Sequence, residues 1–128
     1  MEYIVAAESD IGIAKSVNQD SLCVKVAETE LGNAALLLIC DGMGGLAMGE
    51  LASAEVVQSF SEWFESEFPK HLRNFDREDI ARQVAELLSS LNEKLIAYGE
   101  ANRLTMGTTA TGMIIFNQQY LSFHVGDT

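Results

Sequence analysis

Residues 35–45 read Ala-Leu-Leu-Leu-Ile-Cys-Asp-Gly-Met-Gly-Gly, an apolar run that ends abruptly in an aspartate and a cluster of glycines. Six consecutive apolar residues predict a buried strand, and the glycines predict a tight turn directly after it. The end of such a strand brings Asp41 to the protein surface, so Asp41 is the first candidate functional residue. A helix is predicted over residues 50–68, because apolar residues then recur at helical spacing, namely Leu51, Val56, Val57, Phe60, Trp63 and Phe64.

The segment before this strand supplies a partner for Asp41. Residues 20–27 alternate, with Asp20 on the same face as three apolar side chains, which is typical of a strand. The polar segment 28–33 is expected to close a hairpin that pairs Val26 with Ala35. A period of two then sets Asp20 opposite Asp41, so two carboxylates are predicted to meet at one end of an apolar face.

Two carboxylates in register repel each other and lose hydration, so something must offset that cost. A single aspartate at a strand end would turn to solvent or take up a proton. For two in register, followed by the free carbonyl of Gly42, a bound divalent cation is the better explanation. No cysteine or histidine has comparable spacing, so oxygen donors favour Mg²⁺ or Mn²⁺ over zinc.

The second half of the chain predicts one more helix and one more hairpin. Asp76 is the expected N-cap of a helix that runs to about Tyr98. Strands are expected over 109–116 and 120–126, after a link at 99–104 and with a turn between them. Asp127 ends an apolar row on the last strand, whereas His124 lies on the other face and is interpreted as structural. Outside these elements, residues 2–7 predict a short strand and residues 8–17 a loop.

Composition limits the classes of function. The 128 residues suffice for one globular core, and the net charge of -11 disfavours nucleic acid and anionic membranes as partners. No apolar run approaches the ~20 residues of a membrane span. Cys23 and Cys40 lie in strand-like runs, which favours buried, reduced thiols over a disulfide or a metal pair. We therefore expect a cytoplasmic protein that does not bind membranes.

Four motifs together resemble the metal-dependent protein phosphatase family, also called protein phosphatase 2C, in its bacterial form. They occur in the order of that family and are Gly12-x-x-Lys15-x-x-Asn18-Gln19-Asp20, Asp41-Gly42-Met43-Gly44-Gly45, Met106-Gly107-Thr108-Thr109 and Val125-Gly126-Asp127-Thr128. The resemblance implies an α+β fold, a two-sheet antiparallel β-sandwich flanked by helices (α-β-β-α). Residues 1–128 would be the N-terminal half of a single phosphatase domain.

The same resemblance implies roles for individual residues. Asp41 would bridge two Mn²⁺ or Mg²⁺ ions, and Gly42 would bind metal through its carbonyl. Asp20 would support the same cluster, and Asp127 would belong to a further, weaker metal site. Lys15 would take a catalytic role by binding the substrate phosphate. The implied reaction is hydrolysis of phosphoserine or phosphothreonine in proteins by metal-activated water, a signalling activity.

Three departures from the family pattern qualify this interpretation. Lys15 stands where the family usually has arginine, so the two-pronged grip on phosphate is lost. Met43 stands where many eukaryotic members have a histidine that is a candidate general acid. The chain is also about half as long as such domains. We therefore expect a fragment that is inactive alone and that exposes strand edges through which it forms a homodimer.

Two other classes of function fit parts of the sequence. Residues 42–47 follow a loose G-x-G-x-x-A pattern, which suggests a dinucleotide-binding domain. An acidic residue directly before the glycines and an antiparallel hairpin both argue against that class. The other alternative is a catalytically inactive phosphoprotein-binding or regulatory module with the phosphatase fold.

Overall fold

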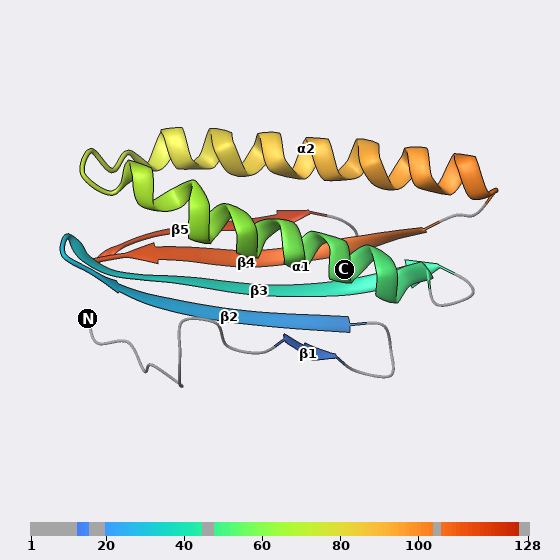
Figure 1. Ribbon diagram of the computed structural model, residues 1–128, viewed down its shortest axis with the longest axis horizontal. Coiled ribbons are helices and arrows are strands. Elements are labelled where there is room, and N and C mark those ends of the chain that lie inside the picture. The colour runs from blue at the N-terminus through green and yellow to red at the C-terminus, as the bar shows by residue number, and fades with distance from the viewer. Residues whose placement is uncertain (1–12, 16–19, 45–47, 104–105, 126–128) are drawn as a thin grey trace.

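The computed structural model describes residues 13–15, 20–44, 48–103 and 106–125 of the chain (Figure 1). In chain order its elements are strands β1 (Ile13–Lys15), β2 (Asp20–Thr29) and β3 (Gly32–Gly44), helix α1 (Met48–Ser66), 3-10 helix η1 (Phe68–His71), helix α2 (Arg77–Asn102), and strands β4 (Met106–Phe116) and β5 (Gln119–Val125). The strand predicted over residues 2–7 lies outside the described residues.

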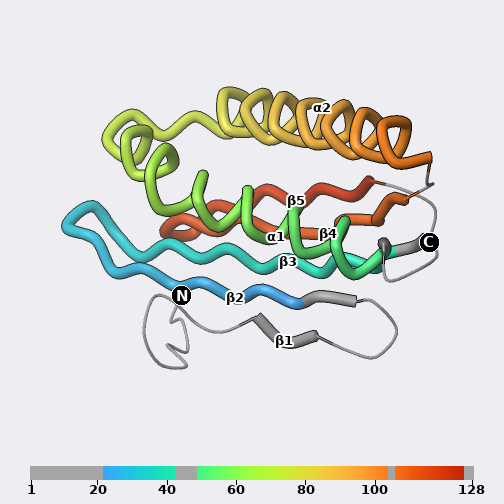
Figure 2. Tube along the Cα trace, turned by 45° about the vertical axis from the view of Figure 1, so that its right-hand side comes forward, coloured from blue at the N-terminus to red at the C-terminus, as the bar shows by residue number. Residues whose placement is uncertain are grey.

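The five strands form one antiparallel sheet whose order follows the sequence, β1-β2-β3-β4-β5. Helices α1 and α2 both lie on one face of this sheet, as the ribbon view and the tube view show (Figures 1 and 2). We call the other face, which no described element covers, the open face. The α+β class and the antiparallel sheet flanked by helices are confirmed, and the described residues supply one sheet and one helix layer of the α-β-β-α arrangement.

The hairpin of β2 and β3 has the predicted register. Val26 pairs with Ala35, and Asp20 pairs with Asp41 at the far end. Gly32, at the start of β3, has a φ of 137°, a conformation that residues with a side chain rarely adopt. Asn117 from the other hairpin fills the space where a Cβ of Gly32 would lie, and its side-chain amide donates to the carbonyl of Leu31 (3.2 Å). The two turns therefore pack against each other at the end of the sheet opposite Asp41.

Strand β3 runs further than predicted. The turn expected at residues 41–45 does not begin there, because Asp41 to Gly44 remain in the sheet and pair with β4. The reason is long-range: β4 begins at Met106 and pairs its first four residues with this glycine-rich end. The link predicted over residues 99–104 is shorter than expected because α2 continues to Asn102, and strand β1 replaces part of the loop predicted over residues 8–17.

The core lies between the sheet and the helices. Leu36, Leu38 and Cys40 of β3 are buried against α1, whose predicted apolar stripe is confirmed at all positions except Leu51, which is exposed. Lys25 also points into this layer with only 3% of its side chain exposed, and it forms an ion pair with Glu65 of α1. Both cysteines are buried free thiols, as predicted.

Helix α2 begins as predicted and ends later. Asp76 is its N-cap, and the carboxylate accepts a hydrogen bond from the backbone N–H of Glu78 (3.0 Å). The helix continues past Tyr98 because the buried Gly99 is accommodated within it, and Arg103 ends it with a left-handed φ of 56°. In the described part of the chain, neither helix is long and apolar enough to cross a membrane.

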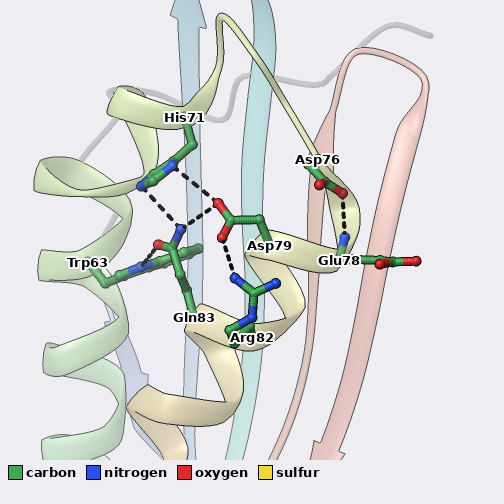
Figure 3. A network of polar contacts seen from close by, with 7 residues as sticks. All are labelled: Trp63, His71, Asp76, Glu78, Asp79, Arg82 and Gln83. Atoms are coloured by element: carbon green, nitrogen blue, oxygen red, sulfur yellow. Dashed lines mark hydrogen bonds and ion pairs between the residues drawn. The ribbon is translucent and has the colours of Figure 1, made fainter.

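A polar network joins the two helices to η1 (Figure 3). Trp63 Nε1–H donates to Gln83 Oε1 (3.1 Å), and Gln83 Nε2 lies 3.2 Å from Asp79 Oδ2 and 3.1 Å from His71 Nε2. Asp79 also pairs with Arg82 (2.9 Å) and lies 3.4 Å from His71 Nδ1. The network satisfies the indole N–H of a mostly buried tryptophan and fixes the helix pair over the sheet.

The contact between the two turns predicts that a substitution at Gly32 lowers the stability of the fold. Gly32→Ala forces a side chain into a positive-φ position and against Asn117, so we expect it to lower the free energy of unfolding by about 1–3 kcal/mol. Urea denaturation followed by circular dichroism measures the change. Glu30→Ala, an exposed substitution in the same turn, is the control and should change stability by less than about 0.5 kcal/mol. Equal effects for the two variants would contradict the role given to Gly32.

Burial raises the pKa of the Cys40 thiol to about 12, with a smaller contribution from neighbouring Cys23. The thiol therefore stays protonated at every pH well below that value, and the thiolate needed for alkylation is scarce. We expect iodoacetamide at pH 8 to leave Cys40 unmodified in the folded protein and to modify it in denaturant, as mass spectrometry of peptides would show. Modification at equal rates in both states would overturn this assignment.

Candidate functional site

The candidate site begins with a row of three residues on the three central strands of the sheet, β2, β3 and β4. Asp41 of β3 pairs with Asp20, the first residue of β2, on one side and with Thr109 of β4 on the other. The side chain of Asp41 is exposed, and the row lies near the end of β3 from which the chain continues to α1. The register thus brings together the two carboxylate-bearing positions that the sequence predicted.

Thr109 supports the backbone of Asp41. Its Oγ1 accepts a hydrogen bond from the Asp41 N–H (3.3 Å), and only 3% of Thr109 is exposed. The neighbouring Thr108 donates from its Oγ1 to the carbonyl of Thr109 (2.8 Å). Asp41 is therefore held on a paired central strand and not on a free loop, which limits where its carboxylate can move.

Gly42 follows Asp41 in the strand and pairs with Thr108. Gly42 is buried, whereas Asp41 beside it is exposed, as expected for successive residues of a strand. The carbonyl of Gly42 and the carboxylates of Asp20 and Asp41 are oxygen donors, and they suit a hard divalent cation such as Mg²⁺ or Mn²⁺. These three positions are adjacent in the sheet, so the donor set fits part of such a site.

The donor set is incomplete in the described part of the chain. No group of three or more His, Cys, Asp or Glu side chains there is arranged to hold a metal ion. Mg²⁺ takes six oxygen ligands and usually keeps several waters among them, so these three donors fit part of one ion's ligand set. Asp127 falls outside the described residues, although β5 ends two residues before it, at Val125, with its last pair opposite Ala110.

Lys15 lies at the same end of the sheet. It is the last residue of β1 and pairs with Ser21, next in sequence to Asp20. Asp20 and Asp41 share one row of the sheet, whereas Lys15 belongs to the next row, that of Ser21 and Cys40, which alternation along the strands assigns to the other face. His124, interpreted as structural, lies in a different part of the open face, where its Nδ1 is 2.6 Å from Thr111 Oγ1.

The sequence alone assigns no role to Thr109. The sequence feature that could have pointed to Thr109 is the Thr108-Thr109 pair at the start of an apolar strand, because a buried hydroxyl there needs a hydrogen-bond partner. That partner, the N–H of Asp41, lies 68 residues away in sequence, so only the sheet pairing reveals it.

Comparisons with known proteins agree on one family. The sequence profile of the protein phosphatase 2C family matches residues 13–128. A protein phosphatase 2C-type protein of Streptococcus pyogenes is 26% identical over 97% of this chain and 48% of its own length. The serine/threonine protein phosphatase PstP of Mycobacterium tuberculosis is 28% identical over 96% of this chain and 21% of its own length.

Solved structures give the same result. The serine/threonine phosphatase of S. agalactiae superposes with a TM-score of 0.67 at 29% identity, over 92% of this chain and 46% of that one. A variant of a bacterial serine phosphatase superposes with a TM-score of 0.70 at 26% identity, over 91% of this chain and 52% of that one. This chain thus spans about half the length of each of these two solved chains. With the family profile matched from β1 to the last residue, the chain belongs to the protein phosphatase 2C family.

Proposed function

We propose that residues 1–128 are the N-terminal portion of a metal-dependent serine/threonine phosphoprotein phosphatase domain. The register that pairs Asp20 with Asp41 at the end of the open face carries this proposal. Membership of the protein phosphatase 2C family supports it, as do relatives and structural neighbours that are named as serine/threonine phosphatases. The substrates would be proteins that carry phosphoserine or phosphothreonine.

In this proposal Asp20, Asp41 and the carbonyl of Gly42 hold Mn²⁺ or Mg²⁺, and Asp127 contributes to a further ion. The bound metal would lower the pKa of a water molecule and stabilise negative charge on the phosphoryl oxygens. Thr109 keeps the Asp41 backbone in place through its hydrogen bond to the N–H. Lys15 would bind the substrate phosphate as a point charge, without the two-pronged geometry of arginine.

The isolated chain is proposed to be inactive, because three adjacent oxygen donors suit part of one ion's ligand set, whereas a site for two ions needs further carboxylates. The rest of the ligand set would come from a longer protein of the length of the relatives, of which this chain spans about half or less. A cytoplasmic location is also proposed, and the two buried free thiols support it, since reduced cysteines are usual in that compartment.

Metal binding by this chain tests the proposed site directly. We expect the 128-residue protein to bind Mn²⁺ weakly and Asp41→Asn to weaken that binding at least ~10-fold, because a neutral amide replaces an anionic ligand. Titration followed by electron paramagnetic resonance of free Mn²⁺ measures both affinities.

Asp76→Asn is the matched control, because Asp76 is an exposed helix N-cap and asparagine caps equally well. The control should bind Mn²⁺ as the unchanged protein does. Equal loss of binding in both variants, or none in either, would contradict the metal site at Asp41.

Hydrolysis of an aryl phosphate distinguishes an active phosphatase from a catalytically inactive regulatory module. A longer protein that contains this domain should show Mn²⁺-dependent turnover, and Asp41→Asn should lower its kcat/KM by a factor of about 10³ or more. The isolated chain should show none. Metal binding without turnover in the longer protein would favour the regulatory module instead.

A further inference from the structure

One assignment of hydrogens satisfies the polar network that joins α1, η1 and α2 (Figure 3). The indole N–H of Trp63 can only donate, so the side-chain oxygen of Gln83, 3.1 Å away, must face it. The amide nitrogen of Gln83 then donates one hydrogen to Asp79 Oδ2 (3.2 Å) and the other to His71 Nε2 (3.1 Å). An indole that is only 8% exposed therefore fixes which end of the Gln83 amide faces His71.

This orientation of Gln83 determines the tautomer of His71. Because the amide N–H of Gln83 is a donor, His71 Nε2 has to be the acceptor and carries no hydrogen. The single hydrogen of the neutral ring is then on Nδ1, which lies 3.4 Å from Asp79 Oδ2. Every donor among these side chains has an acceptor in this arrangement, so the neutral ring in its Nδ1–H form is the one that fits the network.

A second proton on His71 has no acceptor in this arrangement. It would lie on Nε2 and point at the Gln83 amide nitrogen 3.1 Å away, so that two donors face each other. Rotating the Gln83 amide by half a turn would remove the acceptor from Trp63 and bring an amide oxygen against the Asp79 carboxylate. Moving the His71 ring away loses only one contact, and the ring, which is 32% exposed, can then donate to water.

The charged groups around His71 do little to hold its protonated ring in place. Asp79 of α2 faces the ring, and Arg82 already pairs with the other oxygen of that carboxylate (2.9 Å). On the side of η1, Lys70 precedes His71 and pairs with Glu67, the N-cap of η1 (3.1 Å). Helix α1 contributes an uncharged indole to the network. An ion pair between His71 and Asp79, each about a third exposed, contributes little stability.

We propose that protonation of His71 breaks its contact with Gln83 and leaves Asp79 as the polar partner of His71 on α2. Histidine changes its charge between pH 5 and 8, so acidification within this range loosens the segment of residues 67–76, which joins the two helices. The network lies at the end of α1 remote from the candidate site (Figure 1). This pH response therefore does not depend on metal binding or phosphatase activity.

Nitrogen-15 NMR of the imidazole rings tests the tautomer and its coupling to Gln83. At pH 8 the neutral His71 ring should carry its hydrogen on Nδ1. As the pH is lowered to 5, a side-chain amide proton of Gln83 should shift with the same midpoint as the His71 ring, because it loses its acceptor. The indole proton of Trp63 should shift less, because it keeps its acceptor. The chain has one tryptophan and two histidines, so these signals can be assigned.

Hydrogen exchange measures the loosening of the segment. Between pH 7.5 and 5.5, after correction for intrinsic exchange rates, backbone protection over residues 67–76 should fall by about fivefold, on the scale of one lost hydrogen bond. His71→Gln should abolish this fall, because glutamine offers a donor and an acceptor but does not titrate. His124→Gln is the matched control, since it removes the other histidine of the chain, and it should leave the fall unchanged.

Four results would overturn the proposal. They are a neutral His71 ring in the Nε2–H form, a Gln83 amide signal that does not follow the His71 titration, a fall in protection that persists in His71→Gln, and its loss in His124→Gln. Circular dichroism at pH 7.5 establishes whether the two variants are folded. If His71→Gln is not folded, the tautomer and the Gln83 signal of the unchanged protein decide the result.

Discussion

The register between β2 and β3 is the constraint on which the site depends. Side chains alternate across a sheet, so a slip of one residue would move Asp41 to the helix side, among the buried Leu36 and Leu38, and would expose those leucines instead. The turn at Gly32, held by Asn117, fixes this register from the far end of the hairpin. A backbone conformation at one end of the sheet thereby determines where a carboxylate lies at the other.

The parts of this arrangement that follow from local sequence could be predicted. Alternation in β2, the apolar run of β3 and the turn between them fix the pairing of Asp20 with Asp41. The N-cap at Asp76 and, apart from Leu51, the apolar stripe of α1 also follow from spacing alone. Together with the motif resemblance, these local patterns are sufficient to identify Asp20, Asp41 and Gly42 as neighbours.

The parts that depend on long-range pairing could not be predicted. Alternation separates two faces of a strand, but it does not say which face the helices cover, and here they cover the face with Cys23 and Lys25. A lysine at such a position suggests exposure to solvent, and its ion pair with Glu65, a residue 40 positions away, offsets the cost of its burial. The continuation of β3 through Gly44 and the support of Asp41 by Thr109 both require β4, which local patterns cannot align.

The simple strand order has a consequence for the order in which the fold assembles. Two hairpins, β2–β3 and β4–β5, join residues that are close in sequence, whereas the central pairing of β3 with β4 must close a loop that contains both helices. Contacts of large sequence separation form slowly, because the chain entropy lost on closure precedes the gain. The aspartate pair would then be assembled early within the first hairpin, and the threonine that anchors it would arrive with the last and slowest step.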